Sequence, residues 1–185
     1  TQVIDEAGAV TSFIYNAGTL RLEQIARLSN ERIQFTYDDL NFSRTVEAVN
    51  FTAPPVVLTR RVTVLNGFDG PTQISDLSDA SGTLDLVRIQ YDGLGRTLKQ
   101  SLPFRTGDPK YPEVYTTYAY DALGRQVSAT APDGAVSTWA YQPSFVPSGQ
   151  PTVGVSVLER TAWQAERWLG FDALGSMSAS YEAKN

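Results

Sequence analysis

The sequence contains no cysteine and no histidine among its 185 residues. Without cysteine, disulfides and thiolate metal sites are excluded. Without histidine, the usual general base near neutral pH is missing, and with it Ser-His-Asp triads, Cys-His pairs and most zinc sites. An enzyme made from these residues would have to act through carboxylates, lysine or tyrosine alone. We therefore expect a protein that is not an enzyme and needs no cofactor or metal.

Clustered positive charge is also missing. The formal net charge is −5, and the basic residues are scattered, with Arg60-Arg61 as the one adjacent pair. Nucleic acid and anionic membranes attract stripes of Lys and Arg, so neither is an expected partner. No apolar run approaches the ~18 residues of a membrane span, which argues against membrane insertion. The chain starts at Thr1 without a signal peptide, and we interpret it as an excised fragment in preference to a processed product.

Helical periodicity is scarce. Leu22, Ile25 and Leu28 offer the best helical spacing, and a short helix over residues 20–28 stays an alternative to a strand there. Elsewhere the signal is two-residue alternation, as in residues 116–120, where Thr116, Tyr118 and Tyr120 share one face, and β-branched and aromatic residues fill these runs. Such residues fit a pleated, half-buried surface. The chain is therefore predicted to be all-β.

Turn residues punctuate the alternating runs at gaps of about ten to fifteen residues, which is typical of antiparallel hairpins. Asp at the first position of a type I turn caps backbone N–H groups, and Gly at the fourth supplies a positive φ. In Pro132-Asp133-Gly134 the proline presets φ at the second turn position. Hairpins of this kind predict an extended or curved meandering sheet of antiparallel strands.

One turn sequence recurs along the chain. Two copies are intact, a third ends in Ser176, and a divergent fourth lies at Phe35–Asn41. The residues that define the three clear copies are Tyr91, Asp92, Gly95 and Arg96; Tyr120, Asp121, Gly124 and Arg125; and Phe171, Asp172 and Gly175. The pattern resembles the YD repeat of Rhs proteins, a family that includes Rhs toxins, the B and C components of insecticidal toxin complexes, and teneurins.

The resemblance is clear over about residues 89–180 and thin over residues 1–88. It implies a single YD-repeat domain over residues 1–185 that is part of a long, spiralling β-sheet. In the family such a sheet closes into a hollow shell around a polypeptide, or is displayed at a cell surface. The resemblance thus implies a bacterial protein that is secreted or on the cell surface, with polypeptide partners: the rest of the shell, its cargo or a partner subunit.

The repeat residues have a structural interpretation and a binding one. We expect the aromatic residues to stack across strands, and the arginines to pair with acidic neighbours or cover aromatic faces. Alternatively, the repeated side chains form a ligand surface. The candidate surface for carbohydrate stacking is Trp139, Tyr141, Trp163 and Trp168. Two long loops, at residues 105–112 and 143–154, are where binding would be expected to develop.

These observations lead to two hypotheses. The first is a non-catalytic structural segment of a Rhs-like or toxin-complex-like shell that encapsulates or presents a polypeptide. The second is a cell-surface β module that binds carbohydrate or protein through its aromatic residues and long loops. The first requires that the Asp-x-Leu-Gly segments join adjacent antiparallel strands.

Overall fold

The computed structural model describes residues 1–6, 9–27, 31–50, 55–77, 84–143, 155–161, 163, 165–172 and 176–182. These residues form fifteen strands and, within the described ranges, no helix. Each strand is hydrogen bonded to the strands before and after it in the sequence, in the order β1 to β15. The neighbouring strands pair antiparallel, from β1 with β2 to β7 with β8 and from β10 with β11 to β14 with β15, so the predicted all-β meander is confirmed.

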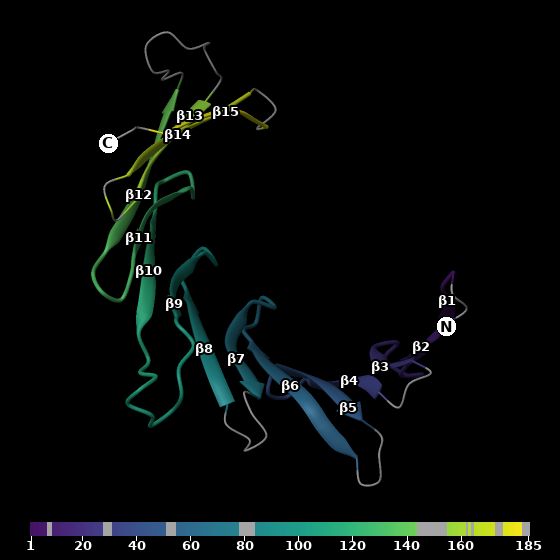
Figure 1. Ribbon diagram of the computed structural model, residues 1–185. Helices are drawn as coiled ribbons and strands as arrows, with labels where there is room; N and C mark the ends of the chain where they lie inside the picture. The colour runs from purple at the N-terminus through teal and green to yellow at the C-terminus, as the bar shows by residue number, and fades with distance from the viewer. Residues whose placement is uncertain are drawn as a thin grey trace. The chain divides into compact units, whose positions relative to one another are not determined.

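The chain divides into two compact units. Unit 1 contains residues 1–89 and 101–113, and unit 2 contains residues 90–100 and 114–185. The strands that begin in unit 1 are β1 (Gln2–Ile4), β2 (Val10–Tyr15), β3 (Leu22–Arg27), β4 (Glu31–Asp38), β5 (Ser43–Asn50), β6 (Val56–Leu65), β7 (Pro71–Leu77) and β8 (Leu84–Tyr91). Figure 1 shows them following one another in chain order, from purple to teal.

Unit 2 holds all three clear repeats. Its strands are β9 (Thr97–Ser101), β10 (Tyr115–Tyr120), β11 (Gln126–Thr130), β12 (Val136–Pro143), β13 (Val155–Arg160), β14 (Glu166–Phe171) and β15 (Met177–Glu182). The Asp92, Asp121 and Asp172 turns join β8 to β9, β10 to β11, and β14 to β15. The repeated sequence therefore does place hairpin turns between adjacent antiparallel strands.

The helical alternative for residues 20–28 is wrong. Leu22–Arg27 is strand β3, in which Ile25 lies between Phe13 of β2 and Ile33 of β4. Leu28 lies outside the described residues. Apolar neighbours on both sides favour a strand at Ile25, because cross-strand side-chain contacts stabilise a sheet where local helical spacing is weak.

The described residues contain little buried core. Among them the buried apolar side chains are Val49, Phe104 and Val157. Phe104 is 2% exposed and belongs to the loop between β9 and β10, where its backbone N–H and C=O bond to those of Leu86 in β8. The predicted loop at residues 105–112 continues from this point. With so few buried side chains, cross-strand neighbours and local ion pairs have to stabilise the sheet.

Candidate functional site

The repeated turn is held together by its first aspartate. The Asp92 backbone N–H donates to the Arg96 carbonyl at 2.8 Å, and the Gly95 N–H donates to the Asp92 carbonyl at 3.0 Å. Asp92 Oδ1 also accepts the backbone N–H groups of Leu94 (2.9 Å) and Arg96 (3.0 Å). Gly95 has φ +79°, a conformation that side chains with a Cβ rarely adopt. Asp92 thus caps backbone N–H groups of the turn, and Gly95 adopts the positive φ that the turn requires.

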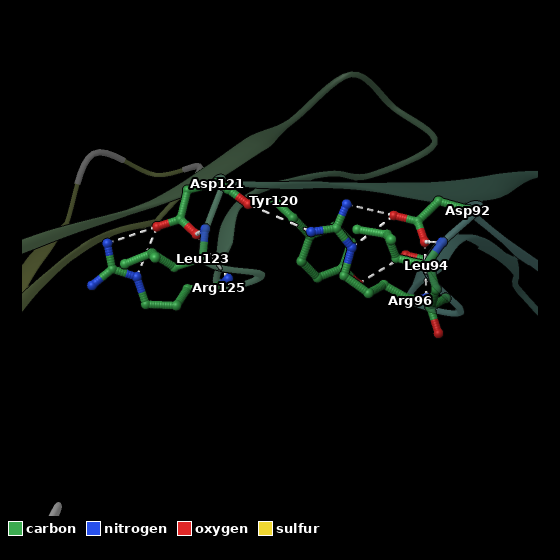
Figure 2. Close-up of polar contacts among 8 residues, drawn as sticks. Asp92, Leu94, Arg96, Tyr120, Asp121, Leu123 and Arg125 are labelled. Carbon is green, nitrogen blue, oxygen red and sulfur yellow. Dashed lines mark hydrogen bonds and ion pairs between the residues drawn. The ribbon is translucent and has the colours of Figure 1, made fainter.

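The last residue of the turn pairs with the first. Arg96 Nε and Nη2 lie 2.7 Å and 2.6 Å from Asp92 Oδ2. The Arg96 guanidinium, followed by its backbone N–H, lowers the pKa of the Asp92 carboxyl from its ordinary value of 3.8. Both side chains are less than a third exposed. The ion pair therefore fixes the guanidinium plane beside the turn (Figure 2).

The fixed guanidinium covers the tyrosine of the next repeat. Arg96 Cζ lies 4.7 Å from the centroid of the Tyr120 ring. The Tyr120 hydroxyl donates to the Thr97 carbonyl at 2.9 Å, directly after Arg96 in the chain. Burial raises the pKa of the Tyr120 phenol above 10.0. We call this set of three contacts the hairpin lock: the Asp–Arg ion pair within a turn, the guanidinium over the tyrosine ring, and the hydrogen bond from the tyrosine hydroxyl to a backbone carbonyl.

The next turn repeats the lock with nearly the same distances. Arg125 Nε and Nη2 each lie 2.7 Å from Asp121 Oδ2, and Arg125 Cζ lies 4.3 Å from the Tyr141 ring centroid. The Tyr141 hydroxyl donates to the Gln126 carbonyl at 2.9 Å. Burial raises the pKa of the Asp121 carboxyl, but bonds from the Arg125 backbone and side chain outweigh it, so the pKa lies below 3.8.

A third lock lies in unit 1, where the repeat sequence had diverged. Arg21 Cζ lies 5.0 Å from the Tyr37 ring centroid, and the Tyr37 hydroxyl donates to the Leu22 carbonyl at 3.1 Å. The first residue of this turn is Asn16, which has no charge to offer. Arg21 instead binds both carboxylate oxygens of Asp39 in the following turn, at 2.7 and 2.9 Å.

Sequence reasoning missed this third lock because its arginine pairs with Asp39 in the following turn and not with the first residue of its own turn. The signal that would have found it is a spacing rule. An Arg at a turn end and a Tyr near the end of the next strand but one are separated by 16 residues in both the Arg21–Tyr37 and the Arg125–Tyr141 pairs, and the longer loop before β10 widens the separation to 24 in the Arg96–Tyr120 pair.

The remaining predicted repeat residues are placed differently. Phe171 ends β14 and has no hydroxyl to donate, whereas Asp172 Oδ1 accepts the Ser176 backbone N–H at 2.9 Å. Gly175 lies outside the described residues. Tyr91 ends β8. The arginine of a lock for this tyrosine would end the turn between β6 and β7, and that place is occupied by Gly70.

The Pro132-Asp133-Gly134 turn joins β11 to β12. The Ala131 N–H donates to the Ala135 carbonyl at 2.8 Å, and the Gly134 N–H donates to the Ala131 carbonyl at 2.9 Å. Asp133 Oδ1 accepts the Ala135 N–H at 3.0 Å, and Gly134 has φ +84°. This turn is the second kind of hairpin connection in the repeat, and it carries no arginine.

The predicted aromatic surface is divided between the two faces of the sheet. Trp139 of β12 lies opposite Glu159 of β13, which lies opposite Arg167 of β14. Trp168 is the residue after Arg167, and it lies opposite Leu158. Side chains alternate between faces along a strand, so Trp139 and Tyr141 share one face and Trp168 lies on the other. Trp163 is 86% exposed, in the turn between β13 and β14.

No group of three or more Asp or Glu residues in the described part of the chain is arranged to hold a metal ion. Nor does it contain a helix of the length and apolarity that a membrane span requires. Three of the hollows on its surface lie beside turns and the loop at residues 102–114, and another lies over the strands β5, β6 and β7.

Comparisons with known proteins agree with the repeat. Residues 113–142 match the RHS Repeat family, a segment that contains the second hairpin lock from Asp121 to Tyr141. No curated protein matches the sequence. The fold is similar to that of a chain in the crystal structure of TcdB2-TccC3-Cdc42, with a TM-score of 0.53 and 11% sequence identity.

That structural match covers 98% of this chain but 11% of the other, so this chain spans about a ninth of the length of the chain it resembles. Residues 113–142 thus match an RHS repeat, and the chain shares its fold with part of that longer chain, which agrees with the predicted resemblance to YD-repeat proteins.

Proposed function

We propose that the chain is a non-catalytic wall segment of a Rhs-like or toxin-complex-like shell that encloses or presents a polypeptide. Residues 1–185 act in it as one repeat domain. The observation that carries the proposal is the hairpin lock, in which charged and aromatic repeat residues are used to fasten one hairpin to the next. Side chains engaged in this way serve the architecture of the sheet.

The use of the repeat side chains supports this proposal over a ligand surface of repeated Tyr, Asp and Arg. Both arginines are paired with their own turn aspartates, and both tyrosine hydroxyls bond to a backbone carbonyl. One ring face of Tyr120 and of Tyr141 is covered by a guanidinium. A sugar would have to displace these contacts before it could stack on the rings.

The thinness of the buried core supports it too. Only three apolar side chains among the described residues are buried, and two of them lie in strands, so the sheet encloses little core of its own. The strands β1 and β15 each have one neighbour in the sheet, and an edge strand carries unpaired N–H and C=O groups. Further sheet and an enclosed polypeptide are the partners that such a wall would require. In this proposal the protein acts outside the cytoplasm, secreted or at a cell surface.

The test uses the parent protein, with an epitope tag inserted in the exposed turn at Gly67. We expect electron microscopy to show a hollow particle, and limited proteolysis to leave an internal polypeptide protected until the shell is opened with denaturant. A solid particle in which every segment is cleaved at equal rates would refute enclosure.

The second candidate is a cell-surface module that binds carbohydrate or protein. One observation favours it: Trp163 is 86% exposed at a hairpin turn. A glycan array separates the two candidates. Glycan binding that is lost in Trp163→Ala, with an unchanged circular dichroism spectrum, would support the surface module. No binding to any glycan on the array would favour the wall segment.

A further inference from the structure

Asn66 opens the turn between β6 and β7, at the place that Asp92 and Asp121 hold in their own turns. Its backbone N–H donates to the Gly70 carbonyl at 2.8 Å. Its side-chain Oδ1 accepts the backbone N–H groups of Phe68 and Gly70, both at 2.9 Å. The Asn66 amide therefore takes the capping role that an aspartate has in the other turns. Unlike a carboxylate, however, it contains a carbon that a nitrogen nucleophile can attack.

The nucleophile is the backbone nitrogen of the next residue, Gly67. Gly67 is exposed, and outside its chain neighbours no heavy atom lies within 4 Å of the position that a Cβ would take. Its N–H has no hydrogen-bond partner among the described residues. A Cβ on this residue would hinder the approach of its nitrogen to the preceding side chain, and glycine has none. The Gly67 nitrogen is thus both unhindered and unengaged.

The turn also activates the amide carbon. When a nucleophile attacks Asn66 Cγ, the negative charge develops on Oδ1, and two N–H donors already bond to that oxygen. Hydrogen-bond donors placed at a developing oxyanion stabilise the tetrahedral intermediate. The leaving nitrogen, Asn66 Nδ2, has no partner in the part of the chain that the structure describes, so solvent can supply the proton with which it leaves.

Two other asparagines in turns lack these features. Asn16 Oδ1 also accepts two backbone N–H groups at 2.9 Å, but its Nδ2 donates to a glutamate oxygen at 2.8 Å and the next residue is Ala17. Asn41 Nδ2 donates to an aspartate oxygen at 2.7 Å, and the next residue is Phe42. Of these three turn asparagines, Asn66 alone combines an unengaged Nδ2 with a following glycine.

We propose that Asn66-Gly67 is a self-modification site, at which the folded turn converts its asparagine into aspartate or isoaspartate. The Gly67 nitrogen bonds to Asn66 Cγ and gives its proton to water. The Cγ–Nδ2 bond breaks, Nδ2 takes up a proton and leaves as ammonia, and a cyclic succinimide remains. Water then adds to either carbonyl carbon of the ring and breaks the bond from that carbon to the Gly67 nitrogen, which is protonated. Water is the one co-reactant, and the inference is independent of the proposed enclosure of a polypeptide.

The two products differ in their effect on the hairpin. Water attack at Cγ gives aspartate, whose carboxylate caps the turn as those of Asp92 and Asp121 do. Because Gly70 ends this turn where the other two have arginine, the new carboxylate gains no ion pair within the turn. Water attack at the backbone carbon gives isoaspartate. That product adds the Asn66 Cβ to the main chain and turns the carbonyl that accepts the Asp69 N–H into a side group, which loosens the β6–β7 hairpin.

Peptide mass spectrometry of the full chain, incubated in mildly alkaline native buffer, tests the proposal. The method follows replacement of the amide NH₂ by OH at each asparagine, and chromatography separates aspartate from isoaspartate. We expect Asn66 to convert at least about tenfold faster than Asn16 of the same molecules, because glycine leaves the attacking nitrogen unhindered. Gly67→Ala is the matched variant, since the site has open space and no positive φ. It should slow the conversion of Asn66 by about tenfold and leave the circular dichroism spectrum unchanged.

The proposal is overturned if Asn66 and Asn16 convert at the same rate in native buffer, or if Gly67→Ala leaves the rate at Asn66 unchanged. It is also overturned if Asn66 converts in concentrated urea but not in native buffer, because the folded turn would then protect the amide. None of these results bears on a protected polypeptide in the parent protein.

Discussion

Replacing Tyr120 with phenylalanine removes one part of a hairpin lock and keeps the rest. The ring stays under the Arg96 guanidinium, while the 2.9 Å bond from the hydroxyl to the Thr97 carbonyl is lost. A typical intramolecular hydrogen bond contributes about 0.5–1.5 kcal/mol net, and the partly buried carbonyl is left without its side-chain donor. We therefore expect Tyr120→Phe to lower the free energy of unfolding by about 1 kcal/mol.

Tryptophan fluorescence is the natural assay, because all three tryptophans lie in unit 2 with Tyr120. About 1 kcal/mol corresponds to a fall of roughly 2–4 °C in melting temperature for a chain of this size. The control is Tyr118→Phe on the same strand, whose hydroxyl has no hydrogen-bond partner among the described residues. Equal effects of the two substitutions, or no effect of Tyr120→Phe, would refute the reasoning.

Three further results are expected. Gly95→Ala should destabilise unit 2 by about 1–2 kcal/mol because φ there is +79°, whereas Gly93→Ala, with open space around it, should cost less than about 0.5 kcal/mol; urea unfolding measures both. The pKa values of Asp92 and Asp121 lie below 3.8 in the folded chain, so their stabilising effect is present above about pH 4 and is lost as the pH falls through the folded values. Urea midpoints from pH 5 to pH 2 should therefore fall less steeply in Asp92→Asn, and an unchanged slope would contradict the assignment. Phe104→Ala should destabilise unit 1 by about 3 kcal/mol, since the side chain is 2% exposed; far-ultraviolet circular dichroism would detect it, and a loss under about 1 kcal/mol would show that the loop is not anchored there.

The fold could be predicted because the residues that determine each hairpin turn lie within that turn. Asp92 and Asp121 each cap their own turns, and Gly95 and Gly124 each adopt a positive φ within four residues of them. Such preferences act within a single turn, so they are visible in the sequence. The strand at β3 was less certain, because what favours it is Ile25 lying between Phe13 and Ile33 on other strands.

The hairpin lock could be predicted only in part. That Arg96 and Arg125 would meet acidic or aromatic groups follows from residue type. Which groups they meet depends on strand register, which brings Tyr120 beside Thr97 across 23 residues. The lock at Arg21 was harder to predict, because the uncharged Asn16 cannot form an ion pair and Arg21 binds Asp39 of the next turn. The candidate aromatic surface failed to account for pleating, which separates Trp139 from Trp168.

The most direct test of the lock is a double-mutant cycle on Arg96 and Tyr120, with Arg96→Gln, Tyr120→Leu and the two combined. Free energies of unfolding come from tryptophan fluorescence in urea. If successive hairpins are fastened through this contact, the two losses will be non-additive by at least about 0.5 kcal/mol. Losses that add to within about 0.3 kcal/mol would contradict it, and would leave the guanidinium and the ring as neighbours that do not stabilise one another.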